Sequence, residues 1–99
     1  MTTRVLLECG DLFFRGKLQE VVRGAGAEPV REEPCELAVI DLARTDAPQR
    51  IANLVARAIP VLAFGSHINA AALRAARDLG ARAVPNSEVE NSLRALLGS

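Results

Sequence analysis

The sequence has few of the residues that build metal sites and disulfide frameworks. It contains two cysteines, Cys9 and Cys35, a single histidine, His67, and three phenylalanines as its only aromatic residues. Two cysteines are too few for a disulfide framework or a structural zinc site, and one histidine without neighbouring ligands does not indicate a metal. We therefore expect no metal centre, no cofactor and no disulfide.

The chain also lacks an excess of charge of either sign and any long apolar run. Twelve basic residues balance twelve acidic ones, whereas nucleic-acid binding needs a concentrated basic face. No stretch approaches the roughly twenty apolar residues that a membrane span requires. The N-terminus leads directly into a strand-like segment, without the pattern of a signal peptide. These features argue against a nucleic-acid partner for this chain by itself and against a membrane, and they favour the cytoplasm.

The residues that are present predict one α/β domain over 1–99. Apolar residues make up 49% of the 99 residues and are chiefly Ala, Val, Leu and Ile, which suits buried parallel strands covered by helices. Short β-branched runs alternate with amphipathic stretches, the pattern of repeated strand–helix units. The expected strands are 4–9, 27–31, 37–42, 61–64 and 81–84.

Helices are expected between most of these strands. The first follows Asp11, the second begins near Asp46, the third covers about 69–79, and a capping box of Ser87 and Glu90 opens the last. We interpret Asp11 and Asp46 as helix N-caps. Short connections and right-handed crossovers then favour a three-layer sandwich around a parallel five-stranded sheet in the flavodoxin-like order 2-1-3-4-5.

One strand–helix unit is incomplete. Only residues 32–36 join the second and third strands, which is too short for a crossover helix of a dozen or so residues. The second helix of this fold is therefore expected to be missing or replaced by a short loop. We expect one face of the sheet to be uncovered there and to serve as a contact for self-association.

In an open parallel sheet, ligands bind beyond the carboxyl ends of the strands, where the strand order reverses. The chain delivers several polar residues to that edge, and these are the candidate site residues. They are Glu8, Cys9, Asp11, Asp41, Ser66, His67 and Asn86.

Three segments resemble the receiver domain of response regulators in two-component signal transduction. They are ELAVIDL at 36–42, IPVLAFGS at 59–66 and AARDLGARAVPN at 75–86. The resemblance implies that Asp41 is the candidate phosphoacceptor. It also implies that the Ala-rich third helix, with the following strand and helix, forms an interface for a protein partner or a homodimer. Candidate interface residues are Ala72, Arg74, Ala76 and Arg77.

The sequence departs from the receiver pattern at the positions that support phosphotransfer. Glu8 and Cys9 stand where receivers have a pair of acidic residues for magnesium, and cysteine is a poor ligand for that ion. Asn86 stands in place of the conserved lysine, which removes a cation from the phosphoryl group. Magnesium is expected only if Asp41 is active. We therefore predict a regulatory or protein-interaction module that is not an enzyme and does not accept phosphate efficiently.

Two alternatives remain open at the level of sequence. The first alternative is a weakly active receiver that is phosphorylated at Asp41. The second is a small cysteine-dependent phosphatase or phosphocarrier that uses Cys9 and Arg15, which have the spacing C-x5-R. In such proteins a thiolate attacks phosphorus. The bulky residues 12–14 in that loop oppose the close backbone approach that phosphate binding needs.

Overall fold

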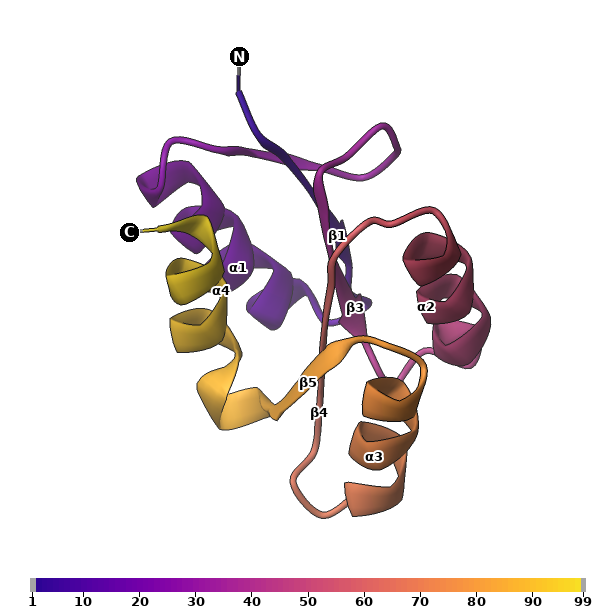
Figure 1. The fold of residues 1–99 in the computed structure, drawn as a ribbon. Helices are drawn as coiled ribbons and strands as arrows, with labels where there is room; N and C mark the ends of the chain where they lie inside the picture. Colours follow the sequence, from indigo (N-terminus) through magenta and orange to yellow (C-terminus); the bar gives the residue numbers. More distant parts are fainter. Residues whose placement is uncertain (1, 99) are drawn as a thin grey trace.

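The computed structural model describes residues 2–98 and contains a parallel sheet enclosed by helices (Figure 1). The five strands lie in the order β2-β1-β3-β4-β5, as the sequence predicts. Their bounds are β1 (Arg4–Glu8), β2 (Glu28–Val30), β3 (Leu37–Asp41), β4 (Val61–Gly65) and β5 (Arg82–Pro85). The polar residues that follow β1, β3, β4 and β5 therefore lie along one edge of the sheet, as expected.

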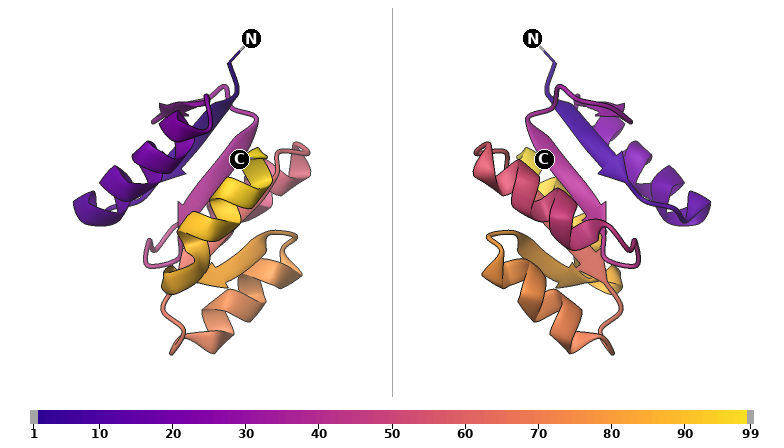
Figure 2. Two further views of the ribbon diagram at one scale, coloured as in Figure 1. Left: turned by 90° about the vertical axis from the view of Figure 1, so that its left-hand side faces the viewer. Right: turned by 90° about the vertical axis from the view of Figure 1, so that its right-hand side faces the viewer.

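Helices cover both faces of the sheet, which completes the three layers. Their bounds are α1 (Leu12–Gly24), α2 (Ala47–Ala56), α3 (Ala70–Asp78) and α4 (Val89–Leu97), with the short 3-10 helix η1 (Asn86–Glu88) before α4. Helices α1 and α4 pack on one face, and α2 and α3 pack on the other (Figures 1 and 2). None of the helices within residues 2–98 is long and apolar enough to cross a membrane.

The central strands are apolar on both sides because each side meets helices. In β3, Val39 faces the core beneath α1 and α4, whereas Ile40 faces the core beneath α2 and α3. In β4, Phe64 is 1% exposed and Ala63 is fully buried on the opposite side. Each fully buried large apolar side chain contributes about 1.5–3 kcal/mol to folding. This double layer of burial fixes the strand register that positions the polar edge.

The N-caps of the helices agree only in part with those predicted from the sequence. Asp11 caps α1, because its Oδ1 accepts hydrogen bonds from the amides of Phe13 at 2.8 Å and Phe14 at 3.2 Å. Asp46 holds the N-cap position of α2 but makes no capping bond. Its carboxylate instead pairs with Arg44 at 3.0 Å. The predicted N-cap position of Asp46 is therefore confirmed, but its side chain does not make the capping bond.

The capping box expected at the start of α4 is also wrong. Ser87 lies inside η1, and α4 begins two residues later at Val89, where Glu88 holds the N-cap position without a side-chain bond. A 3-10 turn tightens the chain before the helix. Glu90 thus lies in the first turn of α4, free of the reciprocal bond that a capping box requires.

The connection between β2 and β3 contains no helix, as the sequence predicts, yet it leaves no uncovered face. Val30 and Cys35 are half-buried and pack against the core that contains Leu6, which is only 1% exposed. The exposed large apolar residues in the described chain lie elsewhere. They are Leu12, Phe13, Ile68, Leu79 and Leu96. The expected apolar contact at this edge is therefore wrong, because the loop itself covers it.

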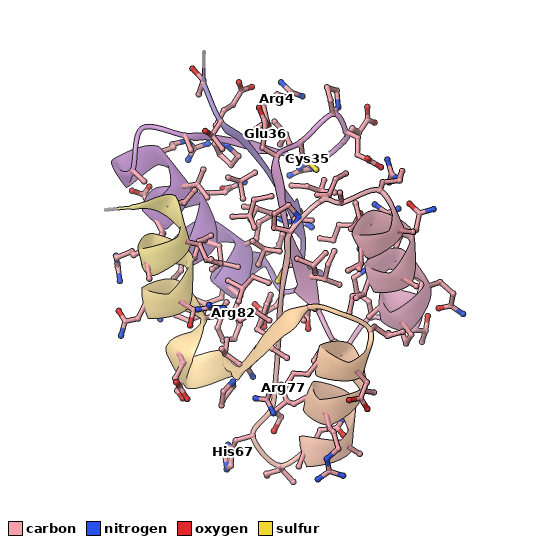
Figure 3. All side chains as sticks on the ribbon, viewed as in Figure 1. Arg4, Cys35, Glu36, His67, Arg77 and Arg82 are labelled. Carbon is pink, nitrogen blue, oxygen red and sulfur yellow. The ribbon has the colours of Figure 1, made fainter. Side chains whose placement is uncertain are left out.

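Ion pairs hold this loop in place. Arg57 of α2 donates to both carboxylate oxygens of Glu33 at 2.6 and 3.0 Å. Arg4 donates from its Nε to the carbonyl of Pro34 at 2.8 Å, and its backbone amide donates to Glu36 at 3.0 Å. Figure 3 places Arg4, Cys35 and Glu36 together at the amino-terminal end of β1. Charged groups thus replace the packing that a helix would supply.

Candidate functional site

A cavity of about 330 Å³ opens at the carboxyl edge of the sheet, where the strand order reverses. It lies between the segments that follow β1, β3 and β5. Its walls include three of the candidates, Asp11, Asp41 and Asn86, and the remaining residues lining it are Gly10, Phe14, Ala43, Arg44 and Phe64. This is the position at which open parallel sheets bind ligands.

The two residues at the end of β1 point to opposite sides of the sheet. Successive side chains of a strand alternate between its faces. Cys9 packs in the core beneath α1 and α4, together with Phe64. Glu8 reaches the other side and meets Arg50 of α2. The pair that stands where receivers hold two acids is therefore divided between the two faces.

Glu8 is fully engaged by Arg50. The Arg50 guanidinium donates to Glu8 through Nε, at 3.1 Å from both carboxylate oxygens, and through a terminal nitrogen at 2.7 Å from Oε2. The side chains are 14% exposed for Glu8 and 27% exposed for Arg50. The same Arg50 nitrogen lies 3.9 Å from Glu33 of the β2–β3 loop. Glu8 therefore belongs to an ion-pair network on the α2 side, outside the residues that line the cavity.

Asp41 has a different environment. Its Oδ1 accepts a hydrogen bond from the amide of Ala43 at 2.9 Å, and its Oδ2 lies 3.7 Å from the Cys9 sulfur, which donates to it. Burial raises the pKa of the Cys9 thiol above its ordinary 9.0, and the nearby Asp41 carboxylate raises it further. A neutral thiol thus faces the candidate phosphoacceptor.

The residues at this edge do not fit a magnesium ion. Magnesium prefers hard oxygen ligands in octahedral geometry. Asp41 and Asp11 supply carboxylates to the cavity. Asp11 caps α1 through its Oδ1, Glu8 is held by Arg50, and Cys9 presents sulfur. Among residues 2–98, no cluster of three or more His, Cys, Asp or Glu side chains is arranged to hold a metal. The side chains at this edge therefore do not provide the ligand set for the magnesium ion that a receiver fold implies.

The geometry does not support the cysteine-phosphatase alternative. Such an enzyme needs an exposed thiolate with an arginine facing the bound anion. Cys9 is 1% exposed, and burial raises the pKa of its thiol. The Arg15 guanidinium donates a hydrogen bond to the carbonyl of Cys9. The cysteine and arginine are close together, but they serve the structure of the turn.

Two candidate residues from the β4–α3 loop do not reach the cavity lining. Ser66 is exposed, and its hydroxyl accepts a hydrogen bond from the amide of Ile68 at 3.2 Å. His67 is exposed and points away from the protein at the tip of the loop (Figure 3). Both residues follow β4 at the carboxyl edge of the sheet, but neither is among the residues that line the cavity.

Arg44 is a cavity residue that sequence reasoning missed. It follows Asp41 by three positions and pairs with Asp46 while lining the cavity. The sequence signal that could have identified Arg44 is its position, three residues after Asp41 in the loop that follows β3. This guanidinium brings a positive charge to a cavity that lacks the lysine of receivers.

The candidate interface on α3 is only partly at the surface. Arg74 is exposed and Ala72 is half-buried, but Ala76 is 2% exposed and belongs to the core. Arg77 lies beside β5 and donates to the carbonyl of Ala83 at 2.8 Å (Figure 3). The inclusion of Ala76 is wrong, because the helix turns this residue onto the sheet.

Comparisons with known proteins find likeness in structure alone. No protein-family model and no curated protein matches the sequence. An orphan response regulator of H. pylori is 16% identical, with a TM-score of 0.73 over 97% of this chain and 91% of that chain. A response regulator from Thermotoga maritima is 10% identical, with a TM-score of 0.79 and full coverage, 100%, of both chains.

A third solved structure extends the agreement. The response regulator protein from Burkholderia multivorans is 21% identical, with a TM-score of 0.68 over 100% of this chain and 97% of that chain. The chain therefore has the fold of response-regulator receiver domains.

Proposed function

We propose that this chain is a regulatory protein-interaction module that keeps the receiver scaffold and does not use phosphotransfer as its switch. One observation carries the proposal: Arg50 holds the Glu8 carboxylate on the α2 side, and a neutral thiol faces Asp41. A receiver needs oxygen ligands and a cation around its phosphoacceptor to stabilise the transferred charge. Around the cavity, the described residues supply the carboxylates of Asp41 and Asp11, of which Asp11 caps α1, together with Arg44 and the amide of Asn86.

A titration with magnesium and beryllofluoride tests this proposal. Beryllofluoride is a stable mimic of a phosphoryl group on a carboxylate. We expect the amide NMR signals of residues around Asp41 to stay unchanged, while an intact receiver domain responds under the same conditions. Shifts centred on Asp41 and abolished by Asp41→Asn would instead identify a weakly active receiver and overturn the proposal.

A gain-of-function variant sharpens the test. Cys9→Asp with Asn86→Lys restores an acid beside Asp41 and the cation of the receiver pattern. If the missing groups are the reason for inactivity, this double variant should bind magnesium and respond to beryllofluoride more strongly than the original chain. The matched control is Ser66→Asp with Ser87→Lys, which adds the same charges at two exposed positions near the same edge.

A further inference from the structure

A groove lies between α1 and α4. These two helices pack on the face of the sheet opposite to α2 and α3 (Figures 1 and 2). Its volume is about 460 Å³. The residues that line it are Lys17, Glu20, Val21, Gly24, Glu90 and Arg94. Four of these six carry charge, and within residues 2–98 none of the four makes an ion pair. The function proposed above does not use them.

The charges form a chequered pattern. Both helices begin at the carboxyl edge of the sheet and run in the same direction (Figure 1). Along α1, Lys17 comes before Glu20, whereas along α4, Glu90 comes before Arg94. Residues three or four apart on a helix share a face. The sign of the charge therefore changes both along each helix and across the groove.

Such a pattern is complementary to itself. A symmetric dimer that stacks this face on its copy has a two-fold axis lying in the plane of the contact. If the axis is parallel to the helices, Lys17 meets Glu90 of the second copy. If it is perpendicular to them, Lys17 meets Glu20 of the second copy. Both arrangements bring opposite charges together.

The same face carries an apolar anchor and open space. Phe13 is 69% exposed and lies one turn before Lys17, whose ammonium is 4.5 Å from the centre of the Phe13 ring. A side chain added at Gly24 would have no atom within 4 Å. Burial of exposed apolar surface favours association. The exposed Phe13 ring next to the groove therefore adds apolar surface that a partner can cover, and Gly24 leaves room for the partner's side chains.

We propose that the α1–α4 face is the contact surface of a homodimer. This inference rests on the proposed function, because it identifies a second copy of this chain as one partner of the interaction module. The equal number of positive and negative charges in the groove favours a copy over a uniformly acidic or basic partner. The whole chain has a formal net charge of +0, so two copies do not repel each other at long range. Exposed ion pairs contribute little each, and we therefore expect a weak dimer.

Sedimentation velocity over a wide range of concentration tests the dimer. We expect a monomer–dimer equilibrium that weakens as salt rises, because salt screens exposed charges. Lys17→Glu should weaken the dimer about tenfold or more, since it places like charges opposite each other. The matched control is Arg31→Glu, the same charge reversal at an exposed position in the loop between β2 and β3, which should leave the dimer unchanged. Circular dichroism confirms that both variants are folded.

A second charge reversal identifies the symmetry. Restoration of Lys17→Glu by Glu90→Lys would indicate an axis parallel to the helices, and restoration by Glu20→Lys would indicate a perpendicular axis. A monomer at every concentration, an equal effect of Arg31→Glu, or restoration by neither second change would overturn the dimer. The beryllofluoride titration is independent of this result, so the two proposals can fail separately.

Discussion

Acidic side chains have different hydrogen-bond partners on the two faces of the sheet. On the α2 side, Glu8 and Glu33 meet guanidinium groups at 2.7 and 2.6 Å. On the α1 side, the hydrogen-bond donors to the Asp41 side chain among residues 2–98 are the Cys9 thiol and the backbone amide of Ala43. The acids on the first side hold structure together, whereas the acid on the second side is left at the position where receivers perform chemistry.

Arg50 connects the two departures from the receiver pattern. It binds Glu8, which stands where receivers hold metal, and it lies 3.9 Å from Glu33 in the loop that replaces the missing helix. An arginine fork satisfies a carboxylate with several bonds and leaves it unavailable to a metal. One side chain, Arg50, therefore joins the acidic residue at the end of β1 to the loop between β2 and β3.

The largest expected effect concerns the thiol beside Asp41. In a Cys35→Ser variant, Cys9 should react with iodoacetamide about a hundredfold or more slowly than after unfolding, because a buried thiol reacts only through local opening. Its pKa lies above the ordinary 9.0, so the thiolate forms only at more alkaline pH. Mass spectrometry of time points measures the rate. A fast reaction at neutral pH would instead support Cys9 as a nucleophile and would contradict its assignment as a buried, neutral thiol beside Asp41.

Removal of Arg50 should have the next largest effect. Arg50→Ala leaves Glu8, which is 14% exposed, without its partner. We expect a loss of about 2 kcal/mol in the free energy of unfolding, between the values for exposed and fully buried pairs. Urea denaturation measures this value. Arg57→Ala is the matched control and should cost less, because the Arg57 side chain is 46% exposed. Equal losses would show that Arg50 has no special place in the network.

Two aspartates at helix starts give a smaller difference. Asp11→Ala removes two hydrogen bonds to the first turn of α1, and such a cap contributes about 1 kcal/mol. Asp46→Ala should cost less, because Asp46 makes no capping bond and its pair with Arg44 is exposed. Thermal unfolding of the two variants measures the difference. The reverse order would show that the pair with Arg44 matters more than the cap.

The smallest effect concerns the pH dependence of the loop. The hydrogen bond from Arg57 holds the pKa of Glu33 below its ordinary 4.5. A lowered pKa in the folded state gives stability that is present above pH 4.5 and is lost as the pH falls through the folded pKa. Urea denaturation between neutral and acidic pH should therefore show a shallower decline for Glu33→Gln. Parallel curves for both proteins would remove Glu33 from the network.

The sequence predicted the scaffold well because the signals for it are local. Periodic apolar residues and the Asp11 cap defined the helices, and the short 32–36 segment was enough to remove one of them. The signals at Ser87 and Glu90 failed for the same local reason, since a capping box and a 3-10 turn compete over the same few residues.

The candidate site was predictable only in outline. The topology placed Asp41 and Asn86 at one cavity, as the switch-point rule requires. Sequence spacing gave no sign that Arg50 would reach Glu8 across 42 positions. It also gave no sign that the β4–α3 loop would carry Ser66 and His67 away from the cavity.

The sequence by itself determined the order of the elements, the absence of a helix between β2 and β3, and the identity of the residues near Asp41. These depend on residue identity and on short-range periodicity. Only the tertiary structure decided which side of the sheet Glu8 serves, what covers Leu6, and that Ala76 is internal. Strand register and helix rotation set those contacts, and both arise from packing between segments that are distant in the chain.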